Sequence, residues 1–361
     1  MNPDLSTTAR ARLAAASIPP QRYGLSVFLR KAYPAVGNGQ QSTGDREPEL
    51  RLRGAPVELV TWDDIPADVG ELVRRKVSDD TFAAFHVLQS AAVHRVNVEG
   101  ARTLGLSVVP DATILVDVSP GSQLVVTERE GAAERDRDLR SSLVALRVGE
   151  GARVQWFGHS VRAPGFAVVE RLAILARDAV LEHHSVLLAA NAMRENVHVV
   201  LGAPGATARV NTLFVGNHEH QFDLGITAEH QAPHTVSNLA AKGVLSGKAQ
   251  AVVRGLVRVE REAPGSDGYQ RCDTLLLSPT AEVDPVPNLE IRTNDVRCTH
   301  GVATGHLNPE QLFYLQSRGF SDAAACDLLV TGFVGGMLRA WPEVQREDLG
   351  AAVSEILRGS P

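Results

Sequence analysis

One short turn pattern recurs at a fixed spacing in this sequence: Gly151-Ala-Arg-Val154, Asp178-Ala-Val-Leu181 and Gly205-Ala-Thr-Ala208. Each of these copies starts 27 residues after the one before it. Looser copies precede them at Asp111-Ala-Thr-Ile114 and Gly121-Ser-Gln-Leu124. A turn of small residues that returns at a constant period is typical of stacked structural repeats, in which each unit buries its apolar face against its neighbours.

Short apolar runs lie between these turns and have the length and composition of β-strands. Examples are Ile114–Val116, Leu124–Val126, Leu143–Leu146 and Val197–Leu201. A stack of such units predicts a mainly β protein with a parallel β-helix core. The pattern leaves one alternative open, an antiparallel sandwich or a cupin-like roll, which also alternates strands with turns.

The composition changes at both ends of the repeats and divides the chain into three parts. Residues 1–95 form a mixed, partly helical segment, residues 96–305 form the β-helix core, and residues 306–361 form a helical domain. In the first part we expect a loop at 35–44 and helices at 7–16, 70–76 and 81–91.

The C-terminal part begins with a clear helix start, because Asn308 can cap the helix and Pro309 suits its first position. Gly319 is expected to end this helix. Further helices are expected at 323–329, from there to about 341, and at 348–358. Such helices can simply close the end of a repeat stack, which otherwise exposes strand edges.

Composition excludes several functional classes. The 361-residue chain has a formal charge of -6 and only 5% aromatic residues, which argues against nucleic-acid binding. It has no apolar run of about 18 residues, so no membrane span is expected. Residues 1–6 do not resemble a signal peptide, and three cysteines do not make a disulfide framework. We therefore expect a cytoplasmic protein with reduced thiols.

Gly243-Val-Leu-Ser-Gly247-Lys248-Ala249 imitates a phosphate-binding loop but does not satisfy its requirements. The loop is one residue short, and Ala249 replaces the Ser or Thr that would hold magnesium. The sequence therefore predicts no ATPase site of its own and no enzymatic turnover by this chain alone.

Four histidines form a candidate metal site: His218, His220, His230 and His234. His218 and His220 would point to the same side of a strand, because strand side chains alternate. A zinc enzyme needs three protein ligands and an open position. This arrangement is the basis of the alternative function, a stand-alone β-helix or cupin-like metalloenzyme, although the same histidines can be polar residues stacked along the repeats.

The region from 269 to 319 carries two of the three cysteines. Cys298 and His300 are two residues apart, so on a strand a thiol and an imidazole share one face. Both groups are ligands for iron and zinc. Arg292 and Arg297 are close in sequence and predict a lowered pKa for the Cys298 thiol. Cys326 lies in a helical run and is expected only to pack.

Three motifs in this region resemble the SufB/SufD family of iron–sulfur cluster assembly proteins, and the SufD type most closely. They are Leu289-Glu-Ile291, Asp295-Val-Arg-Cys298-Thr-His300-Gly301 and Phe313-Tyr-Leu-Gln-Ser-Arg-Gly319. The chain departs from the family at His300-Gly-Val-Ala-Thr-Gly305, where the family has His-Gly-Ala-Thr-Val-Gly. The resemblance implies a right-handed parallel β-helix core.

The resemblance also implies partners and a substrate. It implies pairing with a SufB-like paralogue through the last strands, with a transient iron–sulfur cluster at that interface and none bound stably by the isolated chain. It implies docking of a SufC-like ABC ATPase on the C-terminal helices, whose large apolar residues are Phe313, Phe320, Phe333 and Trp341. The sequence leaves open whether the chain pairs with itself when alone and whether a flavin takes part.

Within the resemblance, Cys298 and His300 stand where the SufD motif has its Cys and His, and the family ties His300 to cluster assembly. Cys272 lies in Gln270-Arg-Cys272-Asp-Thr-Leu-Leu276, which is similar to the SufB segment whose cysteine accepts sulfur. Two interpretations of Cys272 therefore stay open, packing and sulfur handling. A SufB would have Glu-His-Glu in place of Cys298-Thr-His300.

Overall fold

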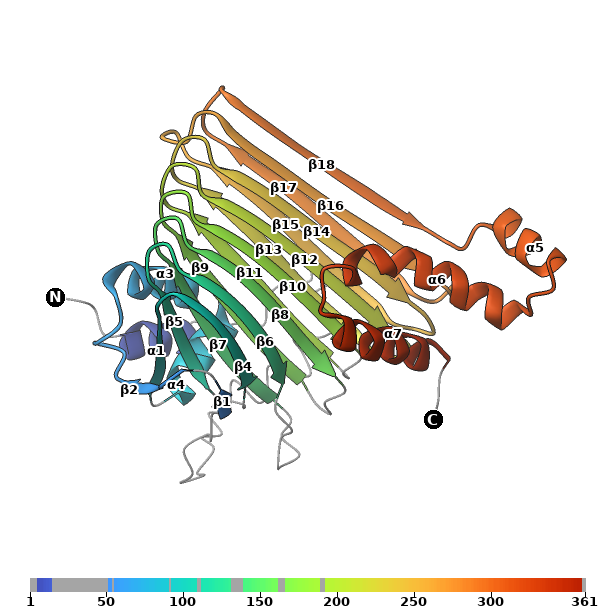
Figure 1. Cartoon of the computed structure of the whole chain (residues 1–361), viewed down its shortest axis with the longest axis horizontal. Helices are drawn as coiled ribbons and strands as arrows, with labels where there is room; N and C mark the ends of the chain where they lie inside the picture. The colour runs from blue at the N-terminus through green and yellow to red at the C-terminus, as the bar shows by residue number, and fades with distance from the viewer. Residues whose placement is uncertain are drawn as a thin grey trace.

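The computed structural model describes residues 5–14, 51–53, 55–90, 92–108, 112–130, 139–161, 166–188 and 192–358. Its centre is a parallel β-solenoid made of two facing sheets of nine strands each (Figure 1). This confirms the predicted fold class, and the parallel pairing excludes the antiparallel sandwich.

Sheet A contains, in spatial order, β1 (Arg51–Arg53), β4 (Ala101–Val108), β6 (Gln123–Glu130), β8 (Arg153–Val161), β10 (Val180–Leu188), β12 (Thr207–Gly216), β14 (Val236–Leu245), β16 (Ser266–Leu276) and β18 (Val296–Gly305). Sheet B contains β2 (Glu58–Val60), β3 (Val93–Val98), β5 (Thr113–Val118), β7 (Leu139–Val148), β9 (Phe166–Leu175), β11 (Ala192–Leu201), β13 (Gln221–His230), β15 (Gln250–Val259) and β17 (Glu282–Ile291). From β3 onward, successive strands of the chain alternate between the sheets. Among the described strands, antiparallel pairing occurs only between β1 and β4 and between β2 and β3.

The turn pattern sets the register of the solenoid. Val180 pairs with Arg153 on one side and with Thr207 on the other, which reproduces the 27-residue period. The first residue of each turn copy has a positive φ: 65° at Gly151, 53° at Asp178 and 76° at Gly205. Glycine adopts this conformation freely and aspartate more readily than most residues, which explains why these residue types begin the turns.

The main core fills the space between the two sheets, and we call the sheet surfaces that line it the inner faces. Alternate residues of every strand point into it, as the pleat of a strand requires. Phe214 and Phe222 are fully buried there and contact each other with ring centroids 5.8 Å apart. The solenoid is therefore a packed core and not an open tube.

The N-terminal helices α1 (Leu5–Ala14), α3 (Ala67–Asp79) and α4 (Thr81–Gln89) cover the outer face of sheet B over β7 and β9. The predicted helices at 70–76 and 81–91 are confirmed, and the Asp80 side chain caps α4 by accepting from the backbone N–H groups of Phe82 and Ala83. The loop predicted at 35–44 lies outside the described residues.

The C-terminal helices are α5 (Pro309–Ser317), α6 (Asp322–Leu338) and α7 (Glu343–Arg358). Asn308 caps α5 as predicted, and Gly319 follows its end with φ 93°. The predicted break near 329 is wrong: α6 is one continuous helix, because Val330, Val334 and Leu338 keep a buried helical stripe beyond that point. The last helix also begins earlier than predicted, at Glu343.

The helices α6 and α7 pack on the outer face of sheet A over β10, β12 and β14, whereas α5 projects beyond the end of β18 (Figure 1). Trp341, just after α6, is only 3% exposed and packs against Phe157 of β8, with ring centroids 5.3 Å apart. The C-terminal segment thus has one part fixed to the solenoid and one part that stands away from it.

Candidate functional site

The strands β17 and β18 are the last strands of their sheets, and each pairs with a described strand on one side only. Their other backbone edges are therefore available for pairing with a further strand. The interior also becomes less covered at this end, where Val302 of β18 is 44% exposed. We call β16, β17 and β18 together the open end of the solenoid.

Cys298 and His300 both lie on β18, two residues apart, so their side chains leave the strand on the same side. Cys298 is opposite Gly268 of β16 and packs partly against the core. His300 is opposite Gln270 and is exposed. The structure therefore places a half-buried thiol and an exposed imidazole two residues apart on an edge strand that is paired on one side only.

The predicted lowering of the Cys298 pKa is wrong. Partial burial raises the pKa of this thiol, and Asp267 adds to that effect. The nearby Arg297 does not offset it, because its guanidinium is bound to the Asp267 carboxylate. In the isolated chain Cys298 is a protonated thiol at neutral pH.

Cys272 lies on β16 and is buried on the inner face, opposite Ala241 on one side and Val302 on the other. Burial raises the pKa of its thiol to about 11. Its Sγ atom is 4.0 Å from the hydroxyl oxygen of Thr274. Neither cysteine is a ready nucleophile in this state, so a change in surroundings has to precede any reaction through the thiolate.

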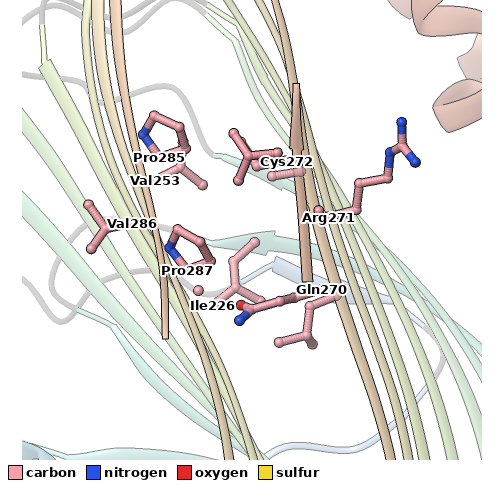
Figure 2. Close-up of a pocket in the computed structure, with 13 residues that line it drawn as sticks. Ile226, Val253, Gln270, Arg271, Cys272, Pro285, Val286 and Pro287 are labelled. Atoms are coloured by element: carbon pink, nitrogen blue, oxygen red, sulfur yellow. The ribbon is translucent and has the colours of Figure 1, made fainter. Parts of the chain in front are cut away.

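A small pocket of about 20 Å³, partly open to the surroundings, lies next to Cys272 between the two sheets. Pro285 and Pro287 of β17 face Gln270 and Cys272 of β16 across it (Figure 2). Gln270 was not identified from the sequence, although its position two residues before Cys272 places it on the same strand face. The two-residue spacing of Gln270 and Cys272 was therefore a signal in the sequence that could have identified Gln270.

The histidines proposed for the alternative metal site do not come together as that alternative requires. His218 and His220 lie in the turn between β12 and β13 and not on a strand, and His218 has φ 55°. His230 is buried, with its ring nitrogens bonded to the hydroxyls of Thr235 and Ser237 at 2.7 and 2.8 Å. His234 occupies another turn with φ 56°.

Within the part of the chain that the structure describes, no three His, Cys, Asp or Glu side chains form a group able to hold a metal ion. The metalloenzyme alternative therefore gains no support from the geometry. The phosphate-loop imitation is likewise a turn, where Gly247 has φ 60° and Lys248 is 3.9 Å from Glu219.

Four aromatic residues of the C-terminal segment were predicted to dock a partner, and they differ in exposure. Phe313 on α5 is 71% exposed, and Phe320 beyond its end is also exposed. Phe333 is half-buried, with the Lys242 ammonium 4.5 Å from its ring centroid. Trp341 is buried against Phe157, as described above. Only the first two present an apolar surface to a partner in this conformation, while Cys326 is half-buried on α6.

A solenoid whose last coils carry two thiols and an imidazole beside two free strand edges belongs to the parallel β-helix proteins and is open at one end. The family model described as "SUF system FeS cluster assembly, SufBD core domain" matches residues 107–333. This chain therefore belongs to the SufBD family.

Relatives of known name agree with this assignment. The chain is 29% identical to the iron–sulfur cluster assembly protein SufD of Escherichia coli over 68% of its own length and 58% of that protein. It is 36% identical to an iron–sulfur cluster assembly SufBD family protein of Mycobacterium leprae over 51% of its length and 50% of that protein. The chain thus matches only about half of the length of these relatives. Among the described helices none is long and apolar enough to cross a membrane.

Proposed function

We propose that this chain is a SufD-like scaffold subunit for iron–sulfur cluster assembly, without catalytic turnover of its own. The observation that carries the proposal is that Cys298 and His300 lie two residues apart on β18, a strand with one free backbone edge. A thiolate and an imidazole suit iron, but two ligands do not complete a site for a cluster. The missing ligands are to come from a second chain.

The second chain is a SufB-like paralogue that pairs with the open end. Strand addition to β17 and β18 would satisfy their free backbone groups and extend both sheets. It would also cover the exposed apolar side chains of Ile291 and Val302. Cys298, His300 and Cys272 would then lie at or close to the interface, with the cluster as their substrate.

The third component is a SufC-like ATPase that docks on the C-terminal segment. Phe313 and Phe320 are the exposed apolar residues that support this docking, while α6 and α7 hold the segment to the solenoid. Because α5 follows β18 directly, motion of a bound ATPase would be transmitted to the edge that carries His300. ATP-driven motion would thereby open or close the interface between the two scaffold chains.

The proposal is tested by reconstitution. The chain alone, the chain with a SufB-like partner, and the complex with the ATPase are supplied with ferrous iron, a cysteine desulfurase and cysteine. We expect clusters, followed by absorbance and by iron and sulfide content, only when the partner chain is present. Equal cluster content on the isolated chain would contradict a shared site.

Docking is tested by exposed substitutions, because removal of residues 307–361 would also uncover the apolar outer face of sheet A. Phe313→Ala combined with Phe320→Ala is expected to abolish co-purification with the ATPase. Val344→Ala on α7 is the matched control, since Val344 is as exposed as Phe313 but lies on the fixed part. Unchanged co-purification of the double variant would refute this docking surface.

A further inference from the structure

The free backbone edge of β17 follows from the hydrogen bonds that the strand makes to β15. The N–H of Glu282 donates to the carbonyl oxygen of Ala249, and the N–H of Arg292 donates to that of Val259. Between these two bonds the parallel register of β17 against β15 is unbroken. The N–H and C=O of one residue in a parallel strand face one neighbouring strand, and those of the next residue face the opposite way. The even-numbered residues of β17 therefore bond to β15, and the odd-numbered residues face the free edge.

Two of the residues that face this edge are prolines. The odd-numbered residues of the strand are Val283, Pro285, Pro287, Leu289 and Ile291. Proline has a carbonyl oxygen but no backbone N–H. The edge of sheet B thus offers an unbroken row of acceptors, while its donors are missing at two consecutive positions in the middle of the row.

The edge of sheet A, formed by β18, has no such gap. The Asp267 N–H donates to the Thr235 carbonyl oxygen on the β14 side, so the next residue of β16, Gly268, faces β18. Only one residue of each opposite pair in a parallel ladder faces its partner strand. Cys298 is opposite Gly268, so the even-numbered residues of β18 face the free edge, and none of them is a proline. This edge keeps all of its donors and acceptors.

A second copy of this chain could not supply the donors that β17 lacks. In a two-fold antiparallel contact that overlaps the whole strand, the alternation allows two registers. One sets Pro287 opposite Pro287 of the second copy, and the other sets it opposite Pro285. In both registers the Pro287 carbonyl oxygen faces a residue without an N–H, and an acceptor that loses water without gaining a donor weakens the contact.

The charges on the outer face of β17 oppose self-pairing as well. Glu282, Asp284 and Glu290 are exposed there. Glu290 binds Arg258 at 2.7 Å, whereas Asp284 has no ion-pair partner among the described residues. The two registers place either Asp284 or Glu282 opposite Glu290 of the second copy. Like charges directly opposite each other destabilise an antiparallel pair.

We propose that Pro285 and Pro287 make the edge of sheet B selective for an unlike strand. That strand presents N–H groups opposite both prolines and basic side chains beside Asp284. The inference rests on the proposed function, because it takes the occupant of the open end to be a different scaffold chain. It adds the feature by which the edge discriminates that chain from a second copy of itself. Because β18 can pair with either, the discrimination lies in β17.

The position of the proline rings allows a clean test. Both rings face the interior of the solenoid, where they line the pocket beside Cys272 (Figure 2). Valine at these positions keeps an apolar side chain of similar size on the inner face and adds an N–H at the free edge. The double variant Pro285→Val with Pro287→Val therefore restores the missing donors and preserves the apolar lining.

The test measures self-association of the full chain, without any partner, by sedimentation over a range of concentrations. We expect the dissociation constant of the double variant for itself to fall about tenfold or more, because each regained backbone hydrogen bond contributes a factor of about five. Its affinity for a SufB-like chain should change less, since that strand already donates to both carbonyls. Urea unfolding of each variant checks that the fold is kept.

Two controls separate the new N–H groups from other effects of the substitutions. Leu289→Val changes a side chain on the same row but adds no donor, because Leu289 already has its N–H at the edge. Pro279→Ala removes a proline from the exposed turn before β17 without reaching the edge. Both variants should self-associate as the wild type does.

Asp284→Lys tests the charge on its own and leaves the backbone unchanged. It should strengthen self-association about threefold, because it turns a repulsive pair on an exposed face into an attractive one. Glu150→Lys is the matched control, since Glu150 lies in an exposed turn between β7 and β8, far from the open end. If the double proline variant does not fold, this comparison decides alone.

A folded double variant that self-associates no more tightly than the wild type would overturn the inference. A wild-type chain that binds itself as tightly as it binds the SufB-like chain would overturn it too. These measurements involve no iron or sulfide, so they are independent of cluster formation. Selective pairing in a complex that builds no clusters would overturn the proposed function alone.

Discussion

The middle coils of the solenoid bury a network of charged side chains, whereas the described residues of the open end bury only neutral polar side chains. Glu128 and Cys272 stand in the same row of the inner face of sheet A, connected in register through Gly158, Ser185, Thr212 and Ala241. In the middle coils Glu128 of this row is matched by Arg171 across the core, whereas His183 of the adjacent inner-face row has no hydrogen-bond partner on either ring nitrogen among the described residues. At the open end the neighbouring acceptor, Gln270 Oε1, has no partner among the described residues.

The middle cluster is held by charged hydrogen bonds. Arg171 of β9 donates to both carboxylate oxygens of Glu128, at 2.5 and 2.9 Å, and to Glu195 at 3.3 Å. The Trp156 indole N–H donates to Glu128 at 2.6 Å, and the Ser185 hydroxyl donates to Glu195 at 2.9 Å. Burial opposes the charge of Arg171, but the two carboxylates outweigh it and raise the pKa of the guanidinium.

The difference teaches how one repeat fold can bury charged pairs in its middle coils and neutral polar groups beside a free edge. A satisfied network in the middle coils can fix the packing of two sheets, because each member depends on the others. The neutral polar groups of the open end lie close to the free edges of β17 and β18, where a second chain can reach them. Each of the following experiments perturbs one side of this comparison.

The largest effect is expected in the middle cluster. Arg171→Ala leaves Glu128 and Glu195 buried without their cation and should destabilise the chain by about 3–5 kcal/mol, seen as a lower urea midpoint. Arg297→Ala at the open end breaks only an exposed pair with Asp267 and should leave the urea midpoint nearly unchanged. Equal losses in the two variants would remove the contrast between the regions.

A similar loss is expected where the C-terminal helices meet the middle coils. Trp341→Ala removes a buried ring from the contact with Phe157 and should cost about 3–5 kcal/mol, with proteolysis of α6 and α7 as a local measure. Phe313→Ala on the projecting α5 should change stability by no more than about 0.5 kcal/mol. If Phe313→Ala proved as destabilising, α5 would be part of the folded core and not a free surface.

A further effect is expected from acid, and it should arise from two buried histidines, His86 of α4 and His230 of β13. Burial lowers the pKa of His86 to about 3 and of His230 to about 4. The unfolded chain takes up these protons near pH 6.5 and the folded chain does not, so stability should fall as pH drops from about 6.5 toward 4. Each histidine contributes up to about 1.4 kcal/mol per pH unit in that window.

The check is a series of urea midpoints between pH 7 and pH 4. His230→Gln should be less stable than the wild type at pH 7 but should show a shallower decline toward acid, because one of the buried histidines no longer titrates. A decline of the same slope in this variant would mean that other groups cause the acid sensitivity.

Much of the fold could be predicted from the sequence, because its determinants are local and repeated. The turns at Gly151, Asp178 and Gly205 carry their period and their backbone requirement in the residue types themselves. The helix ends at Asn308 and Gly319 are equally local signals. The break predicted near 329 was wrong because tertiary packing of Val330 and Val334 on sheet A, which no local signal shows, continues the helix.

The candidate site was predictable only in part. The spacing of Cys298 and His300 was sufficient to place them together on one strand. The pKa of Cys298 was not predictable, because the pairing of Arg297 with Asp267 depends on the register of β18 against β16. Gly255 lies so close to the Gln270 side chain that a Cβ atom there would clash with it, and this contact between the two sheets cannot be seen from sequence distance.

The most direct test of the account is cluster assembly with His300→Ala. His300 is exposed on the edge strand, so the variant should keep its free energy of unfolding within about 1 kcal/mol of the wild type. It should still bind both partners. The reconstituted complex of the variant should nevertheless lose cluster formation, measured as iron and sulfide content per complex. Clusters formed at the wild-type rate would contradict the shared site at the open end, and a variant that no longer folds would show that His300 is a structural residue.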